Sequence, residues 1–454
     1  MIETKETYRA PGGSATAYRR ETARSRTLFE RALQVMPGGN TRHSVALSPY
    51  PVYLESGQGC RVRDVEGEER IDFLNNFTSL ILGHADPQVT AAAQARMARG
   101  TAFAGPTELD VELAELLVER VPAIQAIRFC NSGSEAVMLA VKAARAFTGR
   151  ARIAKFEGAY HGIYDYAQMS EVSTPLNWGP ADRPNVVPDA GSAPGAVADV
   201  VVMPWNDPDA CERLIEEHHK ELAGVVVDAL PLGLSMIPPE PGFLERVREV
   251  TRRHGILLVA DEVLSFRLGY HGAFHGIGIL PDVTCLAKII GGGFPVGAVG
   301  GRADVMEVFD HRRPNAVHHG GTYNGNPVTM AAGLATMRQM TPEAYDRLNA
   351  LGDTLRSEVA RMLRGRGIAA QVLGRGSLFS VRLTDQRLRD WRSISGHVRS
   401  EAIYGKLCHE MLGRGILMSQ RGIVGSLSTP MGTAEVGAFV DALDGSLTAL
   451  GRFK

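Results

Sequence analysis

Apolar residues at the start of the chain follow a helical spacing and then a strand-like pattern. Residues 19–35 carry Leu28, Phe29 and Leu33 among charged side chains, which predicts an amphipathic helix that ends at Pro37. Three short runs separated by turn-forming residues follow, and they predict a small antiparallel meander. The runs are 52–54, 60–64 and 70–73.

Short apolar runs and helical segments then alternate through the middle of the chain. Runs such as VVVMPW and GILLVADEV are nearly continuous in apolar residues, which is typical of strands buried on both faces. Helical segments between such strands predict a mostly parallel sheet covered by helices on both sides. The helices are expected at 134–147, 209–222 and 242–254, and the last stops at Gly255, a residue type that favours helix ends.

The pattern changes after about residue 330 to long helices and a few short strands. Helices are expected at 330–340, 345–364, 401–412 and from Thr433, with strands near 371–383. This predicts an α+β terminal part that shares a sheet with the N-terminal meander. The expected division is a helix and meander of the smaller domain over 1–75, a large α/β domain over 76–330, and the rest of the smaller domain over 331–454.

Composition narrows the class of protein. The 454 residues are 44% hydrophobic and 22% charged, the balance of a soluble enzyme with two or three domains. The formal net charge of -1 provides no field that would gather nucleic acid or anionic lipid. We therefore expect small molecules and further copies of the chain as partners.

Cysteine usage and the terminal sequence bear on metal binding and localisation. The five cysteines are widely spaced and form no CxxC pair, so neither a metal site nor a disulfide framework is expected. Residues 1–13 have no apolar core, and no run reaches the roughly 18 apolar residues of a membrane span. These features predict a cytoplasmic protein with no membrane partner.

Lys288 has the strongest chemical context in the sequence. In PDVTCLAKIIGGGFPVGAVGGR, an apolar strand delivers this lysine into a glycine-rich turn with no other charge nearby. Ligands bind at strand ends of doubly wound sheets, and a desolvated lysine there is more often a neutral nucleophile, which favours Schiff-base chemistry. The competing interpretation is a strand-terminal lysine that reaches solvent.

Asp261 follows five apolar residues in ILLVADEV, at the end of a predicted buried strand. A carboxylate there needs a cation or a donor, and a protonated pyridine nitrogen is such a partner. A Schiff-base lysine paired with an aspartate on a pyridine nitrogen is the arrangement that pyridoxal phosphate requires. The alternatives are a helix cap or an ion pair with Arg267, and Glu262 is a second candidate for such a structural role.

Three loops could hold the remaining parts of a cofactor. In FCNSGSEA a helix begins after a strand, and its free N–H groups form a phosphate site, although a plain serine cap is the competing interpretation. The loops FEGAYHG and HHGGTYNGNP could each touch a planar ring, or simply form packed turns. The candidate ligands are Ser132, Gly133 and Ser134 for a phosphate, and Tyr160, His161 and Thr322 in the other two loops.

Taken in order, the segments NSGSEA, FEGAYHG, ADEV, TCLAKIIGGGFPVGA and GGTYNGNP resemble the class III aminotransferases of fold type I from about residue 28 onward. VMPGGNTR, AFTGR and GGRADVMEVFD are similar to the group that contains glutamate-1-semialdehyde aminomutase, β-phenylalanine aminotransferases and D-phenylglycine aminotransferase. The resemblance implies a pyridoxal 5'-phosphate enzyme with a large domain of the seven-stranded type and a smaller α+β domain formed by both termini.

The resemblance also implies roles for single residues. Lys288 would form the Schiff base and carry the proton, and Asp261 would face the pyridine nitrogen. Val263 and Tyr160 would lie on opposite faces of the ring. His161 would also lie at the cofactor, Ser132, Gly133 and Ser134 would hold the phosphate, and Thr322 would reach the phosphate of a neighbouring subunit in a homodimer.

The sequence departs from the family pattern near the substrate. Asp228 and Ala229 stand where the family usually has Glu-Pro, and residues 264–267 are LSFR rather than the commoner form with Thr-Gly before Phe-Arg. Arg42 and Arg421 resemble the carboxylate-binding arginines of β-phenylalanine aminotransferases, and a guanidinium is suited to that task. A surface position is the competing interpretation for both arginines.

These features predict a ping-pong aminotransferase that moves an amino group from a β-amino or aromatic amino acid to a 2-oxo acid. The aminomutases have a differently spaced arginine after a Ser-Pro turn, an arrangement absent here, and this favours the transferase. The alternatives are an intramolecular aminomutase of the glutamate-1-semialdehyde type and a weakly active protein that binds pyridoxal phosphate. Dependence on an oxo-acid acceptor separates the first alternative from a transferase.

Overall fold

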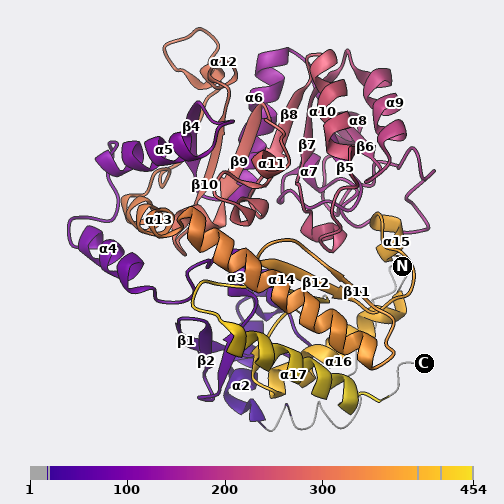
Figure 1. Cartoon of the computed structure of the whole chain (residues 1–454). Helices are drawn as coiled ribbons and strands as arrows, with labels where there is room; N and C mark the ends of the chain where they lie inside the picture. The colour runs from indigo at the N-terminus through magenta and orange to yellow at the C-terminus, as the bar shows by residue number, and fades with distance from the viewer. Residues whose placement is uncertain (1–17, 19–20, 396–397, 420–421, 452–454) are drawn as a thin grey trace.

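A computed structural model describes Tyr18 and residues 21–395, 398–419 and 422–451. Its largest sheet has seven strands and lies in the upper part of Figure 1. Along the sheet the strands are β4 (Ala126–Cys130), β10 (Gly297–Gly301), β9 (Val283–Ala287), β8 (Leu257–Asp261), β7 (Leu222–Val227), β5 (Arg152–Phe156) and β6 (Val200–Met203).

Strands β9, β8, β7, β5 and β6 run parallel, and β10 runs antiparallel to both of its neighbours. Parallel strands need long crossovers, and helices supply them here. The predicted α/β class with a mostly parallel seven-stranded sheet is therefore confirmed. The larger helices that accompany this sheet are α4 (Pro87–Met97), α5 (Glu108–Arg120), α6 (Gly133–Thr148), α9 (Pro208–His218), α10 (Phe243–Arg253) and α13 (Pro327–Gln339).

Both faces of this sheet are buried, as the apolar runs predict. In β7, Val225 and Val227 join a cluster that includes residues of α9 and α10, whereas Val226 joins a cluster built on α6. The alternation follows from the two-residue period of a strand, and it explains why β7 contains no polar residue. The polar residues at this edge therefore follow β7 rather than lie within it.

Two smaller sheets lie in the lower part of Figure 1, and one of them combines strands from both ends of the chain. C-terminal β13 pairs in parallel with N-terminal β3, and one buried cluster extends from Leu113 of α5 to Phe439 of α17. Packing is thus continuous along the molecule, and the boundaries at residues 75 and 330 stay a prediction. The elements are β1 (Leu54–Gln58), β2 (Arg61–Asp64), β3 (Glu69–Asp72) and β13 (Ile416–Leu417) in one sheet, β11 (Gln371–Leu373), β12 (Leu378–Arg382) and β14 (Ile423–Ser426) in the other, and helices α2 (Ala23–Leu33), α14 (Pro342–Gly365), α15 (Trp391–Ser395), α16 (Val398–Gly413) and α17 (Thr433–Ala449).

The first strand differs from its prediction. The run 52–54 was expected to end at a turn at Glu55, but β1 spans Leu54–Gln58 and pairs with β2 through these polar residues. Because β1 is an edge strand and four of its five residues are exposed, backbone pairing rather than apolar burial holds it in the sheet. No helix among the described residues is long and apolar enough to cross a membrane. The fold is completed by the short helices α3 (Asn75–Thr78), α7 (Asp165–Gln168), α8 (Pro194–Ala198), α11 (Ala273–Gly276) and α12 (Ala303–Met306).

Candidate active site

Three ionisable residues stand at the carboxyl ends of three neighbouring strands. Asp228 directly follows β7, Asp261 ends β8, and Lys288 directly follows β9. The register pairs the residue before Asp228 with the residue before Asp261, so the two acids lie side by side across the ladder. This edge of a mostly parallel sheet is where ligands bind.

Lys288 opens the short helix η5 (Lys288–Gly291) with a φ of 52°, in the left-handed region. Its amine makes no hydrogen bond to any residue that the structure describes. Burial lowers the pKa of Lys288 to about 8, although the charges of Asp261 and Asp228 partly oppose this effect. A larger share of the amine is therefore neutral near pH 7 than for an ordinary lysine, as nucleophilic attack on an aldehyde requires.

Asp261 is 4% exposed and is held by two donors. Nδ1 of His161 lies 2.7 Å from Oδ2, and the backbone N–H of Val263 donates to Oδ1 at 3.0 Å. The alternative ion pair with Arg267 is not formed, because that guanidinium donates to carbonyl oxygens of Thr78 and Leu427 and to a serine hydroxyl. Asp261 is thus oriented at the strand end without a cationic arginine.

Glu262 has the structural role that was considered for its neighbour. Its two carboxylate oxygens accept from the backbone N–H groups of Ala273 at 2.7 Å and Phe274 at 3.2 Å. They therefore satisfy donors at the start of α11. Burial raises the pKa of Glu262 to about 7. The two adjacent acids therefore have different roles: Asp261 lies at the edge of the sheet where ligands bind, and Glu262 caps the start of α11.

Asp228 is a second buried acid at the same edge. Its Oδ1 accepts from the backbone N–H of Leu230 at 2.9 Å. Burial, and next to it the charge of Asp261, raises the pKa of Asp228 to about 7. Two neighbouring carboxylates in a dry site cannot both ionise cheaply, so Asp228 carries a proton over much of the acidic range.

This protonation predicts a pH-dependent stability. From the ordinary pKa of 3.8 up to about 7, folded Asp228 keeps a proton that the unfolded chain has lost. The stability that this group contributes is therefore complete below pH 4 and is lost by about 1.4 kcal/mol per pH unit as the pH rises to 7. Asp228→Asn should remove this dependence on pH. In urea unfolding of both cofactor-free proteins, the free energy of unfolding of the variant minus that of wild type should therefore rise between about pH 4 and pH 7.

Other acids also titrate in this range, so the difference between the two proteins is the measured quantity. Asp385→Asn, in an exposed loop, is the control, and its difference from wild type should stay constant with pH. A constant difference for Asp228→Asn as well would contradict the proposed protonation.

The loop before α6 has the geometry of a phosphate site. Ser132 caps the helix through its side chain, which accepts from the N–H of Glu135, so the serine-cap interpretation holds. The N–H groups of Gly133 and Ser134 nevertheless have no acceptor among the described residues, and they lie at the positive end of a 16-residue helix. The cap and the anion site are therefore compatible.

Three loops meet closely around this helix start. A Cβ at Gly133 would lie 2.9 Å from Val263, and a Cβ at Gly162 would lie 2.5 Å from Oγ of Ser134. Only glycine permits these approaches, and they bring the segments after β4, β5 and β8 together. The arrangement places Val263 and the turn with Tyr160 and His161 beside the candidate phosphate site.

The aromatic turn carries one buried group without a partner. His161 is 2% exposed, and its Nε2 has no hydrogen-bond partner among the residues described here. Tyr160 is 48% exposed and makes no hydrogen bond to a described residue. A flat ligand stacked on Tyr160 would bury its exposed face.

The remaining predicted residues do not join this cluster. Thr322 is exposed in the loop before α13, and Arg421 lies outside the described residues. Arg42 is exposed, with its Nη2 donating to Oδ1 of Asn76 at 3.0 Å and its guanidinium 5.3 Å from the centre of the Phe77 ring. The roles of all three stay predictions.

The sequence analysis missed the turn that holds Arg42. All four residues of α3 (Asn75–Thr78) have a φ between 47° and 76°, in the left-handed region that non-glycine residues rarely adopt. The side chain of Asp72 accepts from the N–H of Asn75, and Arg267 donates to the carbonyl of Thr78 at 2.9 Å, so both ends are fixed. The Asn-Asn pair was the available signal, because asparagine tolerates this region best.

A free amine, an oriented acid and an anion site at one sheet edge are the groups that a pyridoxal-phosphate enzyme needs. Comparison with known families agrees, since the model of the family "Aminotransferase class-III" matches residues 43–430. The chain belongs to this family, and pyridoxal phosphate is its cofactor. The residues present fit that group, because the N–H groups of Gly133 and Ser134 at the start of α6 suit a phosphate and the Asp261 carboxylate suits a ring nitrogen.

Several known proteins are similar to this chain. A glutamate-1-semialdehyde 2,1-aminomutase from Exiguobacterium sibiricum is 40% identical over 81% of this chain and 83% of its own length. The solved structure of an omega-transaminase from Sphaerobacter thermophilus is 49% identical, covers 98% of this chain and 99% of its own, and has a TM-score of 0.91. A β-phenylalanine aminotransferase from Variovorax paradoxus is 34% identical, with 96% of each chain covered and a TM-score of 0.87.

The curated relatives contradict the prediction of an aminotransferase and support the aminomutase that was its alternative. Further relatives named glutamate-1-semialdehyde 2,1-aminomutase are 35–42% identical to this chain. The prediction was wrong because it depended on the position of Arg42. An exposed guanidinium can bind a carboxylate in either reaction, so its position does not distinguish them.

Proposed function

We propose that this protein is a pyridoxal-phosphate-dependent aminomutase of the glutamate-1-semialdehyde 2,1-aminomutase type. The similarity to curated aminomutases over most of the chain carries the proposal. The reaction moves an amino group between neighbouring carbons of one substrate, so no second oxo acid is consumed. The buried amine and the two buried acids at the ends of β7, β8 and β9 support the proposal, because they suit this chemistry.

When bound, pyridoxal phosphate supplies an aldehyde that takes up the amino group and a ring that withdraws electrons from the reacting carbon. Lys288 is proposed to hold the aldehyde in the resting enzyme and then to move a proton to and from that carbon through Nζ. Asp261 keeps the ring nitrogen protonated, and His161 orients the Asp261 carboxylate. Ser132, Gly133 and Ser134 hold the phosphate.

Two side chains would sandwich the ring, and one would come from a second subunit. Val263 and Tyr160 are proposed to lie on opposite ring faces. Thr322 is proposed to reach the phosphate site of a partner, so the active unit would be a homodimer. The loop that carries Thr322 borders an open hollow of about 630 Å³, which is also lined by the edge strand β4 and by Asp110 of α5.

Acceptor dependence tests the proposed function. The purified enzyme with bound pyridoxamine or pyridoxal phosphate is incubated with ¹⁵N-labelled glutamate-1-semialdehyde, with or without unlabelled alanine and 2-oxoglutarate. An aminomutase gives an isomer of unchanged mass at the same rate in both mixtures, and the isomer retains its label. Turnover that requires the oxo acid, with loss of label to a second amino acid, would overturn the proposal. Binding of the cofactor without any turnover would support a weakly active binding protein instead.

A further inference from the structure

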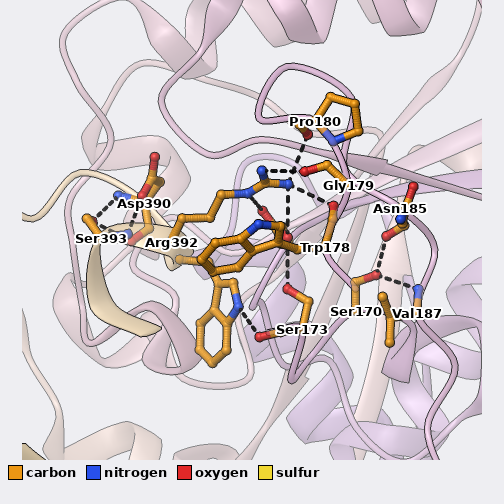
Figure 2. A network of polar contacts seen from close by, with 12 residues as sticks. Ser170, Ser173, Trp178, Gly179, Pro180, Asn185, Val187, Asp390, Arg392 and Ser393 are labelled. Carbon is orange, nitrogen blue, oxygen red and sulfur yellow. Dashed lines mark hydrogen bonds and ion pairs between the residues drawn. The ribbon is translucent and has the colours of Figure 1, made fainter. Parts of the chain in front are cut away.

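Arg392 is the centre of a network that joins the C-terminal part of the chain to the long loop 164–195 (Figure 2). Its guanidinium donates to three successive carbonyl oxygens, those of Trp178, Gly179 and Pro180, at 2.8–2.9 Å. It also lies 4.9 Å from the centre of the Trp178 ring. This use of a planar fork of donors is specific to arginine, because lysine has only a single charged amine.

The same guanidinium pairs with a buried acid next to the candidate active site. Nε of Arg392 donates to Oε2 of Glu157 at 2.9 Å, and Oγ of Ser173 donates to Oε1 at 2.8 Å. Glu157 directly follows β5 and is 3% exposed. A buried carboxylate depends on such partners, so removing Arg392 would leave an uncompensated charge at the end of this strand.

Trp391 supports the next residue of the same turn. A Cβ at Gly158 would lie 2.5 Å from the indole ring, and the φ of Gly158 is 76°, so this position requires glycine. The indole Nε1 of Trp391 donates to the carbonyl of Ser173 at 2.9 Å. The backbone N–H of Gly158 in turn donates to the carbonyl of Ser170 at 2.8 Å.

This turn leads directly to the side chain proposed to stack on the cofactor. Tyr160 follows Gly158 by two residues, and its side chain has no hydrogen bond to a described residue, so the position of its ring depends on the turn that carries it. Nζ of Lys155, fully buried below, donates to the carbonyl oxygens of Ala159 at 2.8 Å and Met169 at 2.6 Å. The turn is thus fixed from inside by the sheet and from outside by the C-terminal segment.

We propose that Trp391 and Arg392 are positioning residues for the cofactor: they hold the turn after β5 so that the Tyr160 ring can stack on pyridoxal phosphate. The C-terminal part of the chain would thereby determine cofactor affinity without touching the cofactor. The inference rests on the proposed role of Tyr160. It is independent of whether the enzyme is an aminomutase, since it concerns binding before any substrate is present.

The test measures cofactor binding rather than activity. Cofactor-free protein is titrated with pyridoxal phosphate, and the visible circular dichroism of each complex reports how the ring is held. Arg392→Met should raise the Kd about fivefold, the scale of one lost aromatic contact, and should lower the dichroism per bound cofactor. Arg392→Lys should recover part of the affinity through Glu157. The matched control is Arg387→Gln, whose side chain is 79% exposed and pairs with Glu240, and its Kd should not change.

A double-mutant cycle separates positioning from general stability. In a Tyr160→Ala background, the substitution Arg392→Met should have little further effect on the Kd, because the contact that it positions is already gone. If Arg392→Met fails to fold, Trp391→Phe takes its place in the cycle, because it loses only the indole donor and some ring area. It should likewise raise the Kd in the wild-type background and have little effect in the Tyr160→Ala background. Equal losses of affinity in both backgrounds, or no change of Kd for Tyr160→Ala alone, would overturn the proposal.

Discussion

Lys288→Ala is expected to lower turnover by at least about 10²- to 10⁴-fold, the range that general acid–base catalysis contributes. The reason is geometric as well as chemical. Lys288 directly follows β9, and its amine makes no hydrogen bond to a described residue. Burial lowers its pKa to about 8. The measurement is the rate of isomer formation, with visible absorption recorded for the same samples.

The accompanying controls distinguish loss of a nucleophile from loss of a charge. Lys288→Arg keeps the positive charge beside Asp261 and Asp228, but a guanidinium does not attack an aldehyde, so this variant should be as inactive as the alanine variant. Both should still bind pyridoxal phosphate through the phosphate loop, without the absorption band of a lysine-bound aldehyde. Activity above a few per cent in either variant would show that Lys288 is not the catalytic amine.

The large sheet and its helices were predictable because burial on both faces leaves a simple pattern. Helices expected at 134–147 and 242–254 are observed at Gly133–Thr148 and Phe243–Arg253. Their ends follow local chemistry, with a serine cap at one start and glycine after each end. The edge strand β1 was misplaced because its polar residues carry no comparable signal.

The strand-end residues of the candidate site were predictable for a related reason. A charged residue that directly follows an apolar strand, such as Asp261 or Lys288, is conspicuous in the sequence. Long-range partners leave no such signal, so the pairing of Asp261 with His161 and of Glu157 with Arg392 required the fold. The latter residues are 235 positions apart, and only the docking of the C-terminal segment brings them together.

Asp261→Asn is expected to lower turnover by about 10²- to 10³-fold, the effect of removing one preorganised electrostatic contact from a dry site. The amide keeps the shape of the side chain but loses the negative charge that would hold a proton on the ring nitrogen. Because the proposed phosphate loop and ring contacts are left unchanged, the Kd for pyridoxal phosphate should rise by less than about tenfold. Turnover and Kd are measured on the same preparation.

Glu262→Gln is the matched control, because it neutralises the adjacent acid on the same strand end. Glu262 accepts from the N–H groups of Ala273 and Phe274 at the start of α11, so its loss should reduce stability and leave turnover per bound cofactor nearly unchanged. Equal losses of turnover in the two variants would mean that a general disturbance of the strand end, and not the charge of Asp261, is responsible. A large loss of turnover in Asp261→Asn alone, with the cofactor retained, would instead support a contact between the Asp261 carboxylate and the ring nitrogen.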